Sequence, residues 1–215
     1  MKKNTIIQIV IIVILTVVLS ILVKVTVDSI NDSKKIPNFN NEMNDKNDKS
    51  QSNLVKYNGN TSIDSDTSVK SGDYSSESED ENAILVTGEN DVELSNINVT
   101  KTGDSSSGDN TSFYGINSAI LAKDKANLTL KNINVTTNAN GANGVFCYGG
   151  SATTSNTSSD GTTITISDSS ITTKKDNSGG IMVTGGGILK ATNLTVNTSG
   201  TSSAAIRSDK GGGNL

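Results

Sequence analysis

The chain has no histidine, no tryptophan, one cysteine (Cys147) and one proline (Pro37) in 215 residues, and only 3% of its residues are aromatic. Without histidine, the chain cannot use Ser-His-Asp or Cys-His nucleophiles, histidine metal sites or imidazole acid–base chemistry. A single cysteine excludes intramolecular disulfides and the paired cysteines of zinc or iron–sulfur sites. Most familiar enzyme classes are thereby excluded, and we expect a non-catalytic protein with no metal site and no cofactor.

A long hydrophobic run occurs only at the N-terminus. Lys2 and Lys3 precede an apolar stretch from Ile6 to Val23, which is long enough to cross a bilayer as a helix. Residues 1–27 are therefore predicted to form a signal-anchor transmembrane helix. A cleaved signal peptide is the alternative, but its apolar region would be shorter and would end at small residues. We expect a single-pass protein of the cell membrane, with its N-terminus cytoplasmic and its bulk extracellular.

Residues 28–81 consist largely of Asn, Asp, Ser and Lys and hold 12 acidic against 6 basic residues. This composition predicts a disordered acidic linker. We interpret its acidic run SSESEDE (75–81) as solvated charge rather than as a cation site. Residues 82–215 hold 10 acidic and 9 basic residues and no basic stripe, so nucleic-acid binding is not expected.

Two families of repeated segments occupy residues 82–215. The first consists of VELSNINVT (92–100), LTLKNINVT (128–136), ITISDSSIT (164–172) and LKATNLTVN (189–197). The second consists of AILV (83–86), AILA (119–122), GVFC (144–147), GIMV (180–183) and AIRS (205–208). Members of the second family are spaced by 36, 25, 36 and 25 residues, which indicates a period of 25 with two 11-residue insertions, within 101–113 and 149–161.

A period of 25 that holds three short strands of alternating polarity predicts an all-β solenoid of stacked coils with three parallel sheets. The alternation also predicts which side chains point inward. In the first strand these are Ile84, Ile120, Val145, Ile181 and Ile206, followed by Val86, Ala122, Cys147, Val183 and Ser208. In the second and third strands they are Val92, Leu94, Leu128, Leu130, Ile164, Ile166, Leu189 and Ala191, and Ile97, Val99, Ile133, Val135, Leu194 and Val196. Asn96, Asn132, Asp168 and Asn193 fall at the bend between these strands, where we expect unusual backbone angles and stacked side-chain hydrogen bonds.

The segments DENAILV, FYGINSAILA, NGVFCYG, ITISDSSITT, DNSGGI, TGGG and SAAIRSDKGGG, between residues 80 and 213, resemble a known family. It is the family of right-handed parallel β-helix surface proteins of clostridia-like gut bacteria, described as adhesin-like or carbohydrate-binding, whose fold resembles that of pectate lyases. The resemblance implies a right-handed β-helix over residues 82–215 and a polysaccharide or host glycan as partner. The repeat breaks off near Leu215, so we expect an incomplete β-helix whose open end favours edge-to-edge self-association.

The candidate binding site lies on the outer face of the first strands. The outward positions Leu85, Leu121, Phe146 and Met182 are apolar, where a solvent-facing sheet would be polar. Phe113, Tyr114, Phe146 and Tyr148 fall in or just before adjacent first strands, and aromatic faces beside hydroxyl groups suit sugar stacking. A glycan site at these four aromatics is the best single site hypothesis that the sequence offers. The favoured interpretation of the apolar row, however, is that a loop packs on it, because apolar surface is more often covered than functional.

Two other functions remain open at this point. A polysaccharide lyase would need clustered Asp for calcium and a Lys or Arg base, whereas Asp104, Asp109 and Asp160 are scattered over the two insertions. Arg207, Asp209 and Lys210 form either part of such a site or an ordinary surface ion pair, and we favour the ion pair. A passive structural stalk at the cell surface would need no ligand at all.

Overall fold

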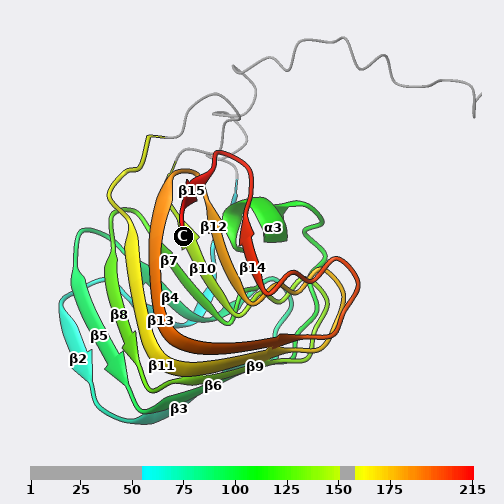
Figure 1. The fold of residues 1–215 in the computed structure, drawn as a ribbon, viewed down its shortest axis with the longest axis horizontal. Coiled ribbons are helices and arrows are strands. Elements are labelled where there is room, and N and C mark those ends of the chain that lie inside the picture. Colours follow the sequence, from blue (N-terminus) through cyan, green and yellow to red (C-terminus); the bar gives the residue numbers. More distant parts are fainter. Residues whose placement is uncertain (1–54, 151–157) are drawn as a thin grey trace, which may run out of the picture. The chain divides into compact units, whose positions relative to one another are not determined.

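The computed structural model describes residues 55–150 and 158–215, in which β-strands joined by turns and loops predominate (Figure 1). The predicted transmembrane helix, residues 1–27, lies outside the described residues, as does the linker up to residue 54. Within the described ranges, no helix is both long and apolar enough to cross a membrane.

One sheet contains the first strand of every coil. Its order is β1 (Gly59–Ile63), β4 (Asn82–Thr87), β7 (Ile120–Lys123), β10 (Val145–Tyr148), β12 (Ile181–Thr184) and β14 (Ile206–Ser208). Each pair is parallel, and the register joins equivalent repeat positions, such as Ile84 with Ile120 and Val145 with Ile181. We call this the first sheet.

The second and third strands of the coils form a single bent sheet. Its members are β2 (Thr67–Val69), β5 (Asp91–Ser95), β8 (Asn127–Lys131), β3 (Gly72–Ser76), β6 (Ile97–Lys101), β9 (Asn134–Thr137), β11 (Thr163–Thr173), β13 (Gly187–Thr198) and β15 (Gly213–Asn214). The prediction of three separate sheets is wrong, because β11 and β13 continue through the bend and join the two rows of strands. The predicted all-β fold of parallel, repeated strands is confirmed, and this stacking is compatible with a parallel β-helix.

Regular strands begin before residue 82, inside the predicted linker. β1, β2 and β3 form a coil whose Thr67 pairs with Val92 and whose Gly72 pairs with Ile97. Burial alternates along β1 and β3, although small and hydroxylated residues occupy most of the inward positions. The linker prediction is therefore wrong for residues 59–76, because the polar composition concealed an alternating pattern in which acids such as Asp73 face outward.

The core is one hydrophobic cluster between the two sheets. The predicted inward residues from Ile84 to Leu189 are buried, which confirms the assignment of inward and outward positions over most of the chain. The exceptions lie in β13 and β14, where Ala191 and Ser208 are exposed, Leu194 and Val196 are partly buried and Ile206 is 61% exposed. Among the described residues, only the short β15 pairs with β13 on this side, and no strand pairs with the outer side of β14.

Candidate functional site

The predicted apolar row on the outer face of the first sheet is covered by protein. Its members belong to a second hydrophobic cluster, which we call the outer cluster. The buried residues of the outer cluster are Leu85, Tyr114, Leu121, Phe146, Tyr148 and Met182, and Val55, Tyr57 and Phe113 pack against them.

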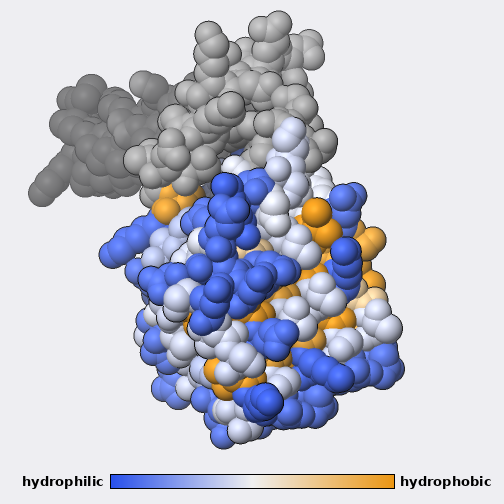
Figure 2. All heavy atoms as spheres, turned by 90° about the vertical axis from the view of Figure 1, so that its left-hand side faces the viewer, coloured by the Kyte–Doolittle hydropathy of each residue, from blue (hydrophilic) through white to orange (hydrophobic). Residues whose placement is uncertain are grey.

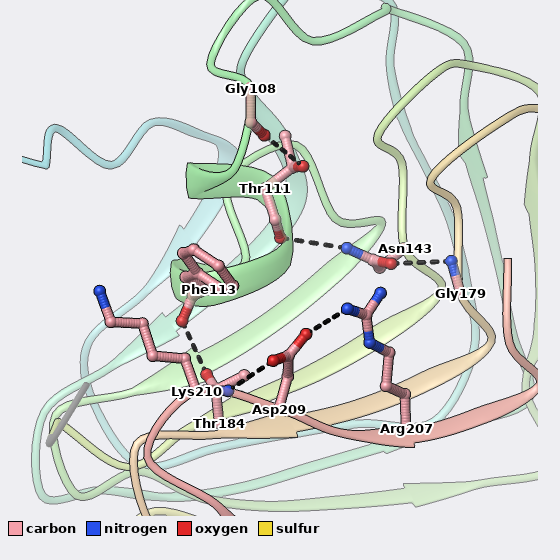
Figure 3. Close-up of polar contacts among 9 residues, drawn as sticks. All are labelled: Gly108, Thr111, Phe113, Asn143, Gly179, Thr184, Arg207, Asp209 and Lys210. Atoms are coloured by element: carbon pink, nitrogen blue, oxygen red, sulfur yellow. Dashed lines mark hydrogen bonds and ion pairs between the residues drawn. The ribbon is translucent and has the colours of Figure 1, made fainter. Parts of the chain in front are cut away.

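The cover is a short helix, α3 (Asn110–Tyr114), which lies in the first insertion (Figure 3). Thr184 Oγ1 donates a hydrogen bond to the carbonyl of Phe113 (2.8 Å), and Asn143 Nδ2 donates to the carbonyl of Thr111 (3.1 Å). Gly115 ends the helix at φ 74°, and a Cβ there would lie 2.7 Å from side-chain atoms of Leu121 and Phe146. A glycine at this position therefore permits both the turn and the close approach of α3 to the sheet.

The structure brings the four predicted sugar-binding aromatics together but buries them. Phe146, Tyr114 and Tyr148 are 0%, 1% and 4% exposed, and Phe113 is partly buried. Tyr114 and Tyr148 meet edge to face, with ring centroids 5.7 Å apart. Burial also raises the pKa of the Tyr148 hydroxyl above its usual value. The predicted glycan site at these rings is therefore corrected, because the rings pack inside the outer cluster and removal of so much apolar surface from water is favourable.

Charged side chains lie at the edge of α3 (Figure 3). Arg207 forms an ion pair with Asp209, as the sequence favoured. Lys210 Nζ lies 5.0 Å from the centroid of the Phe113 ring and 5.7 Å from that of Tyr114. Lys210 therefore connects the segment after β14 to the rings of the cover, whereas the Arg207–Asp209 pair joins neighbouring residues of that segment.

Two of the three acids in the insertions bind nearby polypeptide, while Asp109 precedes α3 and makes no side-chain capping bond. Asp104 accepts a hydrogen bond from the backbone of Asn140 (2.8 Å), and Asp160 accepts bonds from the backbone and hydroxyl of Thr162 (2.8 and 2.7 Å). Among the described residues, no group of three or more Cys, Asp or Glu side chains is placed to hold a metal ion.

Two further titratable side chains, those of Lys101 and Cys147, are buried. The sequence placed Cys147 among the inward residues, whereas Lys101 was not predicted to be buried. Lys101 is fully buried, and its Nζ donates to the carbonyls of Ser78 and Gly103, both at 2.7 Å. Burial lowers the pKa of this amine to about 8, against the opposing effect of Glu81 and other acids. Lys101 continues the inward alternation of Ile97 and Val99, so its burial could have been predicted. Burial likewise raises the pKa of the Cys147 thiol to about 12.

An open polar groove runs across several coils at the bend between the second and third strands. Its volume is about 450 Å³, and we call it the bend groove. Its lining residues are Asn96, Ile97, Asn98, Asn132, Ile133, Asn134, Asp168, Ser169, Ser170, Asn193 and Thr195. The sequence assigned the bend residues a structural role only, and the regular recurrence of Asn and Asp was the signal for the groove.

The four bend residues adopt the predicted backbone conformation. Asn96, Asn132, Asp168 and Asn193 have φ values of 51°, 53°, 53° and 52°, in the left-handed region that Asn and Asp tolerate. Asn132 Nδ2 donates to Asn96 Oδ1 at 2.7 Å, and Asn193 Nδ2 donates to Asp168 Oδ1 at 2.9 Å. The predicted stacking of these side chains is thus confirmed within two pairs of coils. All four are exposed, so they hold the bend and also face solvent.

The exterior of the second strands is also polar. Figure 2 shows a mostly hydrophilic face with small hydrophobic patches between the polar side chains.

The chain has no significant match among protein-family models, curated proteins or solved structures.

Proposed function

We propose that this protein is a membrane-anchored, non-catalytic surface protein that binds glycans through the bend groove and acts as an adhesin. The observation that carries the proposal is the groove itself, where amide and hydroxyl groups recur from coil to coil beside one carboxylate, that of Asp168. In this proposal the fold is a right-handed β-helix of the pectate-lyase type.

The repetition of the bend groove supports a polymeric ligand. Neighbouring parallel strands are spaced by roughly 4.8 Å, so equivalent side chains recur at that interval along the stack. A linear polysaccharide likewise presents its hydroxyl groups at regular intervals. Asn98, Asn134, Ser170 and Thr195 occupy equivalent positions on four successive third strands and offer hydrogen-bonding groups to such a chain.

The location at the cell surface rests on the N-terminal sequence. The stretch Ile6 to Val23 has the length and composition of a membrane span, and the repeats that follow it resemble surface proteins. We propose that the N-terminus is cytoplasmic and that the coils are extracellular.

Glycan binding can be tested with one blocking variant and one matched control on β13. Thr195 lines the bend groove, whereas Asn197, two residues further on the same exposed side, does not. The full chain in mild detergent is mixed with a panel of neutral, amino-substituted and acidic polysaccharides, and bound protein is measured by co-sedimentation. We expect Thr195→Tyr to reduce binding and Asn197→Tyr to leave it unchanged.

The same assay distinguishes the alternatives. Absence of binding to the whole panel by the folded chain would leave a passive stalk. Release of ultraviolet-absorbing unsaturated sugars would overturn the non-catalytic assignment in favour of a lyase.

A further inference from the structure

The row of side-chain hydrogen bonds in the bend groove is interrupted between Asn132 and Asp168. Asn132 donates to Asn96, and Asn193 donates to Asp168, but no hydrogen bond joins the side chains of Asn132 and Asp168. An ionised carboxylate has no proton to donate, so the residue at position 168 cannot continue the row toward Asn132. As a result, two hydrogen-bond acceptors lie on successive coils with no hydrogen bond between them. They are Asn132 Oδ1 and the second carboxylate oxygen of Asp168.

Asp168 is also the charged residue of the groove lining, since every other lining residue is Asn, Ile, Ser or Thr. The hydrogen bond from Asn193 lowers the pKa of the Asp168 carboxyl below its usual value, and Ser167 and Lys131 act in the same direction. Asp168 is therefore ionised at neutral and mildly acidic pH. Lys131, which lies just outside the lining, partly offsets this charge.

Most amide groups of the groove already donate one hydrogen bond to a neighbouring coil and keep one N–H for a ligand. Asn98 Nδ2 donates to Asp73 at 2.8 Å, and Asn96 Nδ2 donates to the carbonyl of Lys70 at 3.0 Å. The groove thus offers a ligand both donors and acceptors, and its one charged group is the carboxylate of Asp168. A ligand that carries a positive charge together with donors would complement this carboxylate and the neighbouring Asn132 Oδ1.

We propose that the bend groove selects glycans that contain amino sugars with a free, protonated amine, and that the ammonium group binds between Asn132 and Asp168. The proposal rests on the glycan-binding function above and specifies its ligand class. An ammonium group supplies three donors, and its hydrogen bond to a carboxylate is strengthened by charge. Acidic polysaccharides are disfavoured, because Asp168 repels them and no cationic side chain lines the groove.

Asp168→Asn is an unusually well-matched variant for the test. Asparagine occupies the equivalent bend position at 96, 132 and 193, with the same backbone conformation, so the substitution removes the charge and preserves the bend. Asp91→Asn is the control. Asp91 is an exposed carboxylate that also accepts a side-chain bond from the next coil, from Asn127 Nδ2 at 2.7 Å, but it lies outside the groove lining.

The experiment measures the affinity of the full chain in mild detergent for three oligosaccharides of equal length, at mildly acidic pH and low salt. The probes are oligomers of glucosamine, of N-acetylglucosamine and of galacturonic acid. We expect glucosamine oligomers to bind most tightly. Asp168→Asn should weaken their binding by about two- to five-fold, the range for one exposed ion pair, without changing the affinity for the acetylated oligomer. Asp91→Asn should change neither affinity, and Lys131→Gln should strengthen binding of the amine form.

Three results would overturn the inference in different ways. Equal affinity for the amine and acetylated oligomers, with both lost in Thr195→Tyr, would refute amine selection and leave glycan binding by the groove intact. Equal weakening by Asp168→Asn and Asp91→Asn would show that general charge, and not the groove, attracts the amine. Absence of binding to all three probes and to the wider panel would refute both this inference and the proposed function.

Discussion

Asn132 Nδ2 donates a hydrogen bond to Asn96 Oδ1 at 2.7 Å, although the two residues are 36 positions apart in the chain. Each residue sits at φ near 50°, and each marks the bend of its own coil. The bond therefore links the stacking of coils to the local backbone conformation that only a few residue types tolerate.

We expect Asn132→Ala to destabilise the protein by about 1–2 kcal/mol, because alanine disfavours the left-handed backbone region and cannot donate the bond. Asn132→Gly loses the same bond but adopts this φ freely, so its cost should be smaller. Urea denaturation of both variants measures the difference. Equal losses of stability would show that the backbone conformation contributes nothing.

Phe146→Ala tests the finding that the aromatics of the outer cluster are structural. Phe146 is fully buried beneath α3, so the substitution leaves a cavity, and we expect a loss of about 3–5 kcal/mol. Phe113→Ala is the matched control, since Phe113 is only partly buried, and its loss should be clearly smaller. A Phe146→Ala protein of unchanged stability that lost glycan binding would restore the sugar-stacking site that the sequence suggested.

Much of the fold could be predicted because the repeat is regular. The alternation in segments such as LTLKNINVT identified the inward residues, and the recurrent Asn or Asp identified the bend. The coil of β1 to β3 was missed because Thr61, Gly72 and Ser76 occupy inward positions where the later coils have aliphatic residues or Lys101. Composition reports average polarity, whereas a strand depends on alternation.

The candidate site was less predictable, for a different physical reason. The sequence correctly showed that Phe146 and Met182 point outward from the first sheet, but an outward direction does not establish exposure. The α3 cover is held by bonds between distant segments, such as Thr184 to Phe113, 71 residues apart, which no local pattern reveals. The bend groove likewise exists only once the coils are stacked.

Cys147 should be protected from thiol reagents in the native protein. It is fully buried, and its pKa of about 12 leaves little thiolate at pH 8. We expect labelling by a maleimide or disulfide reagent to be very slow without denaturant and to become rapid through the unfolding transition. The rate of labelling as a function of urea concentration is the measurement. Rapid labelling of the fully folded chain would contradict the burial of this strand.

Lys101 makes the stability of the protein depend on pH, and a substitution can isolate this contribution. Its pKa is about 8 in the folded protein and 10.5 in the reference state that represents the unfolded chain. Below pH 8 both states are protonated, and the folded state carries the cost of a buried charge. Between about pH 8 and 10.5 the unfolded state binds more protons, so this residue's contribution to stability rises with pH.

Lys101→Met removes this titration while it retains a long apolar side chain. At pH 7 we expect the variant to be less stable by about 1–3 kcal/mol, because the carbonyls of Ser78 and Gly103 lose their donor. At about pH 10 the gap should widen, because only the unsubstituted protein gains from deprotonation of the amine. Comparison of the two proteins at each pH cancels the other titrating groups that they share. A gap of the same size at both values would show that Lys101 keeps an ordinary pKa, and hence that its amine is not held in the buried position between these two carbonyls.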